Sequence, residues 1–266
     1  MLFRILFKIP FFRGRYYGFH KRIFQPYHLF AGVKKQIYYR ENILLDVNLD
    51  DWIQQQVYFL GEYEKAETDY LYHVLKPGDT FIDIGANIGL FSLNASKIVG
   101  NSGKVYSFEA FKPNYIQFKK HIVQNKIQNI KAENKAVSND STPIEIRYND
   151  SQNNIGMASA FLEEFTITEK VEAVTLDQYL SENSLEKVDL IKIDIEGGEY
   201  NALLGMAETL AKYKPQIIIE MNSETLAKSN GSEKQLLNLL YGYHYQLKQK
   251  LTTAESSYNA VFEFCR

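Results

Sequence analysis

From about residue 78 onward, short runs of β-branched and aliphatic residues alternate with longer segments of helical spacing. This alternation is typical of parallel strands joined by crossover helices, and strands buried on both faces read as continuous apolar runs. The chain is therefore predicted to form an α/β, doubly wound, mostly parallel sheet. Seven strands are expected, with the last antiparallel, at residues 80–83, 104–109, 130–137, 188–193, 216–220, 243–247 and 258–264.

Segments of helical spacing fill the intervals between these strands. Gly100 ends one such segment, and Pro113 suits the first turn of another. The predicted helices cover residues 52–60, 69–75, 90–99, 113–125, 199–210 and 232–240, the first two of which are placed as a lid over a pocket. Strand-like runs at 144–148 and 170–174 flank a polar loop and indicate an inserted hairpin.

The composition is that of one globular domain with an appendage. The 266 residues are 45% hydrophobic and 23% charged, which is near the globular average. A single cysteine, Cys265, excludes an intrachain disulfide and a cysteine-based metal site and favours a cytoplasmic protein. We assign residues 1–45 to a basic, aromatic N-terminal arm and residues 46–266 to the main domain. The sequence sets no oligomeric state.

The arm differs sharply in charge from the rest of the chain. Nine of the 30 cations lie in the first forty residues with no Asp or Glu, which leaves 21 cations against 32 anions elsewhere. Bulky apolar residues accompany these cations, but Arg4, Lys8 and Pro10 interrupt any run approaching the ~20 residues that span a membrane. Two alternatives stay open: peripheral contact of residues 1–40 with the inner face of a membrane, or an arm packed on the domain or on a partner subunit.

Four acidic residues follow or end successive predicted parallel strands: Asp83, Glu109, Asp194 and Glu220. In open α/β sheets, ligands bind outside the carboxyl ends of the strands. A lone acid at such a position is usually a solvated loop carboxylate. Four together indicate a site.

The segment Asp83-Ile-Gly-Ala-Asn-Ile-Gly89 joins the first strand to a helix. Its glycines Gly85 and Gly89 allow a ligand close to the backbone, but the pattern is not the Gly-x-Gly-x-x-Gly of dinucleotide folds. The loop therefore suits a ligand without a pyrophosphate, such as S-adenosylmethionine, whose ammonium group needs hydrogen-bond acceptors. Asp83 and the carbonyl groups near Gly85 are the expected acceptors, and Asn87 is expected to orient the loop.

The second strand ends at Glu109, where a carboxylate can accept hydrogen bonds from both ribose hydroxyls. This role is shared with NAD-binding folds, so Glu109 alone does not discriminate. Ala110 or Phe111 is expected to pack on the adenine.

Three acids lie within six residues in Asp194-Ile-Glu-Gly-Gly-Glu199, at a strand-to-helix turn. Such crowding raises carboxyl pKa values and favours a functional site. Asp194 is expected to face the sulfonium or the acceptor, and Glu196 lies on the turn. For Glu199, a role at the helix start is an equal alternative.

With these motifs the chain resembles the FkbM family of methyltransferases. The matching segments are residues 76–89, 108–109, 134–138, 174–177, 191–199 and 215–220, which together span roughly residues 60 to 220. The resemblance implies a Rossmann-like class I methyltransferase fold, S-adenosylmethionine as the donor, and O-methylation of a hydroxyl on a sugar, polysaccharide or natural product. Ala136, within the third segment, is placed at the cofactor. Ala110 departs from the proline usual in the family.

A hydroxyl acceptor needs a general base, since it is a poor nucleophile. Glu196 is the preferred base, with Asp194 and Glu220 as further catalytic candidates and His73 and His244 as histidine alternatives. A divalent cation held by the three carboxylates is less favoured, and no metal site is assigned. Tyr63, Asn153 and Asn154 are the substrate-binding candidates.

Other functions remain as alternatives to a glycan O-methyltransferase. The acceptor can be another small-molecule hydroxyl or an amine, or the chain can be a non-catalytic, membrane-associated scaffold. An NAD-dependent oxidoreductase is a less favoured alternative, because this chain lacks the third glycine of the dinucleotide-binding pattern. Nucleic acid is not an expected partner, because the body is acidic and no Asn-Pro-Pro-Tyr tetrapeptide occurs.

Overall fold

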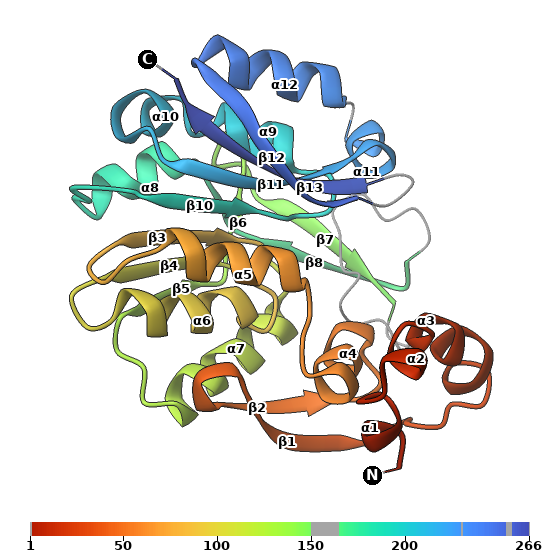
Figure 1. The fold of residues 1–266 in the computed structure, drawn as a ribbon. Coiled ribbons are helices and arrows are strands. Elements are labelled where there is room, and N and C mark those ends of the chain that lie inside the picture. Colours follow the sequence, from red (N-terminus) through yellow and green to blue (C-terminus); the bar gives the residue numbers. More distant parts are fainter. Residues whose placement is uncertain (1, 150–164, 230, 254–256, 266) are drawn as a thin grey trace.

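The computed structural model describes residues 2–149, 165–229, 231–253 and 257–265, and its centre is a seven-stranded sheet (Figure 1). Five neighbouring strands are parallel, and β13 is antiparallel to both strands beside it. This confirms the predicted doubly wound, mostly parallel sheet. In spatial order the strands are β12 (Tyr245–Thr253), β13 (Ser257–Phe264), β11 (Gln216–Asn222), β10 (Leu190–Ile193), β3 (Thr80–Ile84), β4 (Lys104–Phe108) and β5 (Ile130–Glu133).

Both faces of the sheet are buried, because alternate residues of each strand point to opposite sides. On β3, Phe81 packs with α5 (Lys65–Val74) and α6 (Leu90–Val99), while Ile82 belongs to the core on the other face. That second core also contains residues from α8 (Leu176–Glu182), α9 (Glu199–Leu204), α10 (Ala207–Tyr213), α11 (Ser223–Lys228) and α12 (Glu233–Gly242). The continuous apolar runs of the sequence thus correspond to strands sandwiched between helices.

The predicted third strand is interrupted. It divides into β5 and β6 (Ala136–Val137), which leaves the main sheet and pairs with β9 (Ala173–Val174). The side-chain amide of Asn134 donates to the carbonyl oxygens of Glu109 and Ala110, at 2.8 and 3.0 Å, and thereby ties the interruption to the end of β4. The inserted hairpin is present as β7 (Ile144–Tyr148) and β8 (Ile167–Val171), so its second strand begins earlier than predicted.

The single helix predicted at residues 199–210 is two helices, α9 and α10, separated at Gly205. A Cβ at Gly205 would lie 2.0 Å from the carbonyl oxygen of Ser138, so the chain passes too close for a side chain. The carboxylate of Asp177 then accepts hydrogen bonds from the backbone N–H groups of Glu208 and Thr209, at 2.9 and 2.7 Å, and starts α10 afresh.

A β-hairpin that the sequence analysis did not predict precedes the main domain. It consists of β1 (Lys34–Tyr39) and β2 (Ile43–Asn48), joined by the short helix η2 (Arg40–Asn42). Its apolar side chains share a core with Phe118 and Ile122 of α7 (Lys112–Gln124). The hairpin spans the boundary predicted at residue 45.

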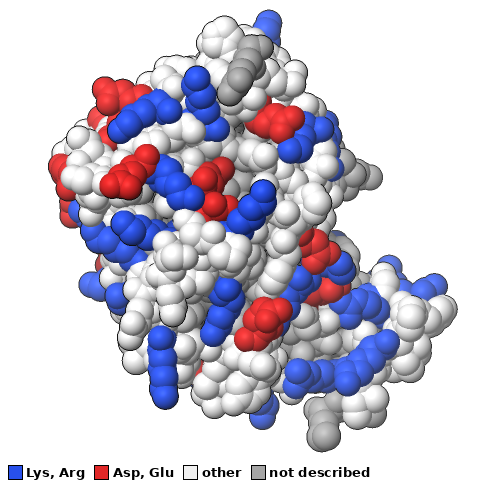
Figure 2. All heavy atoms as spheres, turned by 60° about the vertical axis from the view of Figure 1, so that its left-hand side comes forward, with Lys and Arg blue, Asp and Glu red and all other residues white. Residues whose placement is uncertain are grey.

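The N-terminal arm forms α1 (Leu2–Leu6), α2 (Pro10–Arg13), α3 (Tyr16–Phe19) and the π-helix η1 (His20–Phe24), gathered beside α4 (Trp52–Leu60) at one corner of the molecule (Figure 1). Phe7, Tyr16 and Phe24 are buried against Phe59 of α4. Figure 2 shows Lys and Arg side chains on the visible face of this lobe.

Among the described residues, no helix is both long enough and apolar enough to cross a membrane.

Candidate active site

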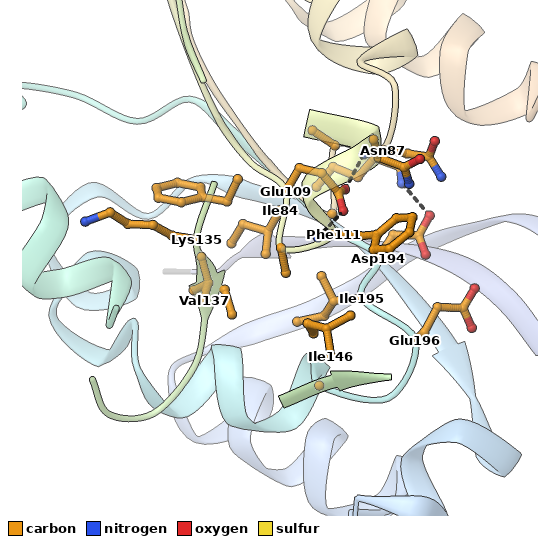
Figure 3. Close-up of a pocket in the computed structure, with 18 of the residues that line it drawn as sticks. Ile84, Asn87, Glu109, Phe111, Lys135, Val137, Ile146, Asp194, Ile195 and Glu196 are labelled. Atoms are coloured by element: carbon orange, nitrogen blue, oxygen red, sulfur yellow. Dashed lines mark hydrogen bonds and ion pairs between the residues drawn. The ribbon is translucent and has the colours of Figure 1, made fainter. Parts of the chain in front are cut away.

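A pocket lies at the carboxyl ends of β3, β4 and β10, with the turn after β10 along one wall (Figure 3). Nine of the residues predicted for the site line it: Tyr63, Gly85, Asn87, Glu109, Ala110, Phe111, Ala136, Asp194 and Glu196. Asp83, Gly89 and Glu220 are not among the lining residues. Asn153 and Asn154 lie outside the described residues. The α4 helix and the loop after it contribute Ile53 and Tyr63 to the wall.

Gly85 is required by the protein itself. Its φ is +89°, and a Cβ there would lie 1.8 Å from the carbonyl oxygen of Asp194. Its backbone N–H and that of Ala86 both donate to the carbonyl oxygen of Phe108, at 2.9 and 3.0 Å. The glycine therefore lets the ends of β3, β4 and β10 meet, which is a reason for a glycine in addition to the expected approach of a ligand.

Gly89 is glycine for a different reason from the one expected. It also has a φ of +89°, but a Cβ there would lie 2.0 Å from the ring of Phe118. The residue caps α6 where α7 packs against it. The structure thus places Gly89 in helix packing, and its assignment to the cofactor pocket is not supported by position.

Asp83 is fully buried beneath the pocket. Ser92 Oγ donates to its Oδ2 at 2.5 Å, while Oδ1 has no hydrogen-bond partner among the described residues. Burial raises the pKa of this carboxyl. A buried oxygen that accepts no hydrogen bond costs free energy. Oδ1 therefore fits a ligand that brings a hydrogen-bond donor, such as the ammonium group of S-adenosylmethionine.

Glu109 is held by the backbone at the end of β4. The N–H of Asn87 donates to Oε2 at 2.6 Å, and the N–H of Phe111 donates to Oε1 at 2.8 Å. Burial raises the pKa of Glu109 to about 7. Each carboxylate oxygen has a second lone pair. The two oxygens are thus oriented and can still accept from a pair of ribose hydroxyls, a fit with the expected cofactor.

Lys192 is a pocket residue that the sequence analysis did not single out. Its side chain is 2% exposed, with Nζ 2.6 Å from Asp194 Oδ2, 4.0 Å from Glu64 Oε2 and 4.4 Å from the centre of the Phe91 ring. Burial alone would lower its pKa, but the carboxylates of Asp194, Glu64 and Asp83 outweigh burial and raise it. The signal in the sequence that could have revealed Lys192 is a lysine inside an otherwise apolar parallel strand.

Glu64 is the second residue that was missed. Burial raises its pKa to about 8, although the nearby Lys192 ammonium acts in the opposite direction. Its φ of 41° lies in the left-handed region, at the start of α5. No motif of the sequence distinguishes this glutamate from the other acids before the sheet.

Glu196 and Glu199, the two acids of the turn after β10, have different surroundings. Glu199 is 1% exposed and accepts from the backbone N–H groups of Ile195 and Gly197, each at 3.0 Å, so it shapes the turn. Glu196 has a φ of 53° and points along the pocket wall (Figure 3). Its carboxyl keeps contact with solvent. Partial burial in the pocket is the main cause that raises its pKa to about 7, and the charges of Asp194 and Glu199 act in the same direction.

Glu220 lies within β11 and not at its end. Burial, followed by the charge of Asp194, raises its pKa to about 9, so it holds a proton at neutral pH. A protonated carboxyl that does not line the pocket is not suited to act as a general base, the role for which Glu220 was a candidate. His73 and His244 are also absent from the pocket wall. The described residues contain no group of three or more His, Cys, Asp or Glu arranged to hold a metal ion.

The site was then compared with known proteins. A family profile described as the methyltransferase FkbM domain matches residues 83–247. The AMB antimetabolite synthetase AmbE of Pseudomonas aeruginosa is 24% identical over 241 residues, covering 77% of this chain and 11% of that protein. The catalytic subunit of a tRNA (adenine(58)-N(1))-methyltransferase of Candida albicans is 31% identical over 71 residues, 27% of this chain and 21% of that protein. The chain thus spans between a tenth and a quarter of the curated relatives it matches.

One solved structure with a TM-score of 0.50 shares the fold. A Clostridium thermocellum protein assigned as an rRNA methylase has a TM-score of 0.50 and 11% identity, with 75% of this chain and 93% of that chain covered. An FkbM methyltransferase of Methylobacillus flagellatus has a TM-score of 0.48 and 16% identity, with 80% of this chain and 55% of that chain covered.

Proposed function

This chain belongs to the FkbM family of S-adenosylmethionine-dependent methyltransferases, and from that premise we propose that its acceptor is a hydroxyl of a sugar or glycan. The observation that supports this proposal is Glu196, a carboxyl on the pocket wall with its pKa raised to about 7. A general base works best when its pKa is near the working pH. Glu196 is therefore suited to take the proton of a hydroxyl, which is a weak nucleophile.

The residues divide between binding and proton transfer. Glu109 orients the ribose, Asp83 provides an acceptor beneath the glycine turn, and Asp194 lies between them and the turn after β10. Bound S-adenosylmethionine supplies a methyl group on a positively charged sulfur. Glu196 would take the proton of the acceptor hydroxyl at its carboxylate.

Lys192 keeps the acids of the pocket in place. Its ammonium group holds the carboxylate of Asp194 at 2.6 Å and compensates part of the negative charge around it. We assign it as a positioning residue. Without a cation at this point, the charge of the Asp194 carboxylate would be left uncompensated in a partly buried site.

Polar side chains of the pocket wall support a sugar acceptor. Tyr63 and Asn201 line the pocket together with Glu196. Hydroxyl and amide groups suit the hydroxyls of a sugar, because each can both donate and accept hydrogen bonds.

The proposal is tested with purified protein and methyl-labelled S-adenosylmethionine. Surface glycans from cells with and without the gene are compared by mass spectrometry, and glycans from the deficient cells are offered to the protein. We expect one additional methyl ether, formed by the wild type and by Glu224→Gln, an exposed acid on α11. Glu196→Gln should abolish transfer but bind S-adenosylhomocysteine normally. Methylation of these glycans by Glu196→Gln at the wild-type rate would contradict the assignment.

A second candidate acceptor is a small metabolite. The similarity to an antimetabolite synthetase over 77% of this chain favours it, because that protein belongs to the synthesis of a small molecule. A labelled extract of small metabolites, separated from the glycans by size, distinguishes the two candidates by where the label appears.

A further inference from the structure

The N-terminal arm uses only part of its apolar surface to pack on the domain. Phe7 and Phe24 are at most 2% exposed, in the aromatic cluster around Phe59. Ile5, Ile9 and Phe11 instead are 57%, 47% and 59% exposed. We call these three residues the apolar tip.

The three residues of the apolar tip lie close together along the backbone of the arm. The N–H of Lys8 donates to the carbonyl oxygen of Ile5, and the N–H of Phe12 donates to that of Ile9, at 3.1 and 3.0 Å. These bonds join α1 and α2 by a tight turn and keep the three side chains within seven residues of one another. Isolated exposed apolar residues are common, but a cluster of three large ones marks a contact surface.

Cations surround the apolar tip. Lys8 is exposed, and the Arg15 guanidinium lies 3.8 Å from the centre of the Phe11 ring. Of the nine cations in the first forty residues, only Arg13 and Arg40 form ion pairs within the described part of the chain, with Glu62 and Asp69. Seven positive charges are therefore left without a countercharge from the described residues, and no acid precedes Glu41.

We propose that the apolar tip and its cations dock the protein on an anionic lipid surface, with the tip inserted among the acyl chains and the cations at the headgroups. The charge pattern favours this occupant, since each cation near an anionic bilayer strengthens binding and inserted apolar side chains add to it. A second copy of the chain would place like charges against one another. The inference is independent of the acceptor and of the methyl transfer.

The position of the arm couples such docking to the pocket. Phe59 and Trp52 of α4 receive the aromatic residues of the arm, and Ile53 of the same helix lines the pocket. Figure 1 shows α4 between the arm and the sheet. A docked arm would therefore hold the pocket at a fixed position relative to the lipid surface.

Co-sedimentation with vesicles tests the proposal on the full chain. Vesicles of phosphatidylcholine with phosphatidylserine should bind the protein, while vesicles of phosphatidylcholine alone should bind it weakly, and salt should reduce binding. The double variant Lys8→Gln/Arg15→Gln should bind about 25-fold less, from about fivefold for each cation. The triple variant Ile5→Ser/Ile9→Ser/Phe11→Ser should lose binding even at low salt.

A matched control comes from α7. Ile116 and Val123 are 58% and 73% exposed there, away from the arm, so Ile116→Ser/Val123→Ser should leave vesicle binding unchanged. Unfolding transitions of all variants should equal that of the wild type, because every changed side chain is exposed. Equal binding to neutral and anionic vesicles, or loss in the α7 variant alone, would overturn the proposal. The proposal would also be overturned if the protein did not bind vesicles and instead formed a dimer, seen by light scattering, that the triple variant abolishes.

Discussion

Replacement of Gly85 by alanine separates two reasons for a glycine, and Gly61 provides the matched control. Both residues have positive φ, +89° for Gly85 and +74° for Gly61, so both variants adopt a backbone conformation that costs about 1–2 kcal/mol. Only Gly85 has a neighbour in the way. Its added Cβ would lie 1.8 Å from the carbonyl oxygen of Asp194, whereas nothing lies within 4 Å at Gly61.

The magnitude follows from that contact. Ordinary van der Waals contact begins at 3.4 Å, so the Cβ and the Asp194 oxygen must move apart by 1.6 Å, the difference from 1.8 Å. Overpacking of this kind costs about 1–3 kcal/mol in addition to the backbone strain. We expect the free energy of unfolding to fall by about 1–2 kcal/mol in Gly61→Ala and by about 2–5 kcal/mol in Gly85→Ala.

Chemical unfolding measures both losses, and calorimetry with S-adenosylhomocysteine measures the effect on the pocket. Displacement of a reacting group by about 1 Å can cost roughly a hundredfold in rate, so turnover of Gly85→Ala should fall by about that factor. Gly61→Ala should retain wild-type affinity and turnover. Equal losses of stability in the two variants, with normal binding in both, would refute the contact as the reason for Gly85.

Three further predictions concern charges of the pocket. Lys192→Met leaves Asp194 and Glu64 without their cation and should lower the free energy of unfolding by about 3–5 kcal/mol at pH 8. The loss should be smaller at pH 5, where Glu64, whose pKa burial raises to about 8, is protonated, and unfolding curves at both pH values check this. Glu109→Gln should weaken S-adenosylhomocysteine binding by about tenfold to a hundredfold, from about 1.5–3 kcal/mol for a hydrogen bond to a charged group, and unchanged calorimetric affinity would contradict the ribose role. Because a carboxyl with pKa about 7 is deprotonated above that pH, turnover by Glu196 should rise through pH 7 to a plateau, whereas a flat profile would exclude this base.

The sheet was predictable because its signals are local and strong. The apolar run ending at Ile193 and the glycine turn at Gly85 fix strand, turn and helix in succession, and parallel strands then bring their ends together. The hairpin of β1 and β2 gives a weaker signal. Its buried residues, Ile43, Leu45 and Val47, alternate with half-buried ones, and the pair is stabilised by packing on α4, α6 and α7, which are distant from it in sequence.

Parts of the site could not be predicted, because a sequence does not show which neighbour a residue faces. Gly89 follows the pattern of a ligand loop, yet the ring of Phe118 occupies the space beside it. For Glu199 the sequence left a role at the helix start as an equal alternative, and the backbone N–H groups that donate to its oxygens agree with a structural role in the turn. Glu64 lies far from Lys192 in sequence, so its approach to that residue depends on how the chain before α5 folds back.

The raised carboxyl pKa values of the pocket lead to a coupling between cofactor and base. Burial raises the pKa values of Glu109 and Glu196 to about 7, so at neutral pH the pocket holds protons that a positive charge nearby would expel. S-adenosylmethionine, held by Glu109 and Asp83, would bring such a charge on its sulfur. Its binding would therefore favour the deprotonated form of Glu196, the form that can take the acceptor's proton.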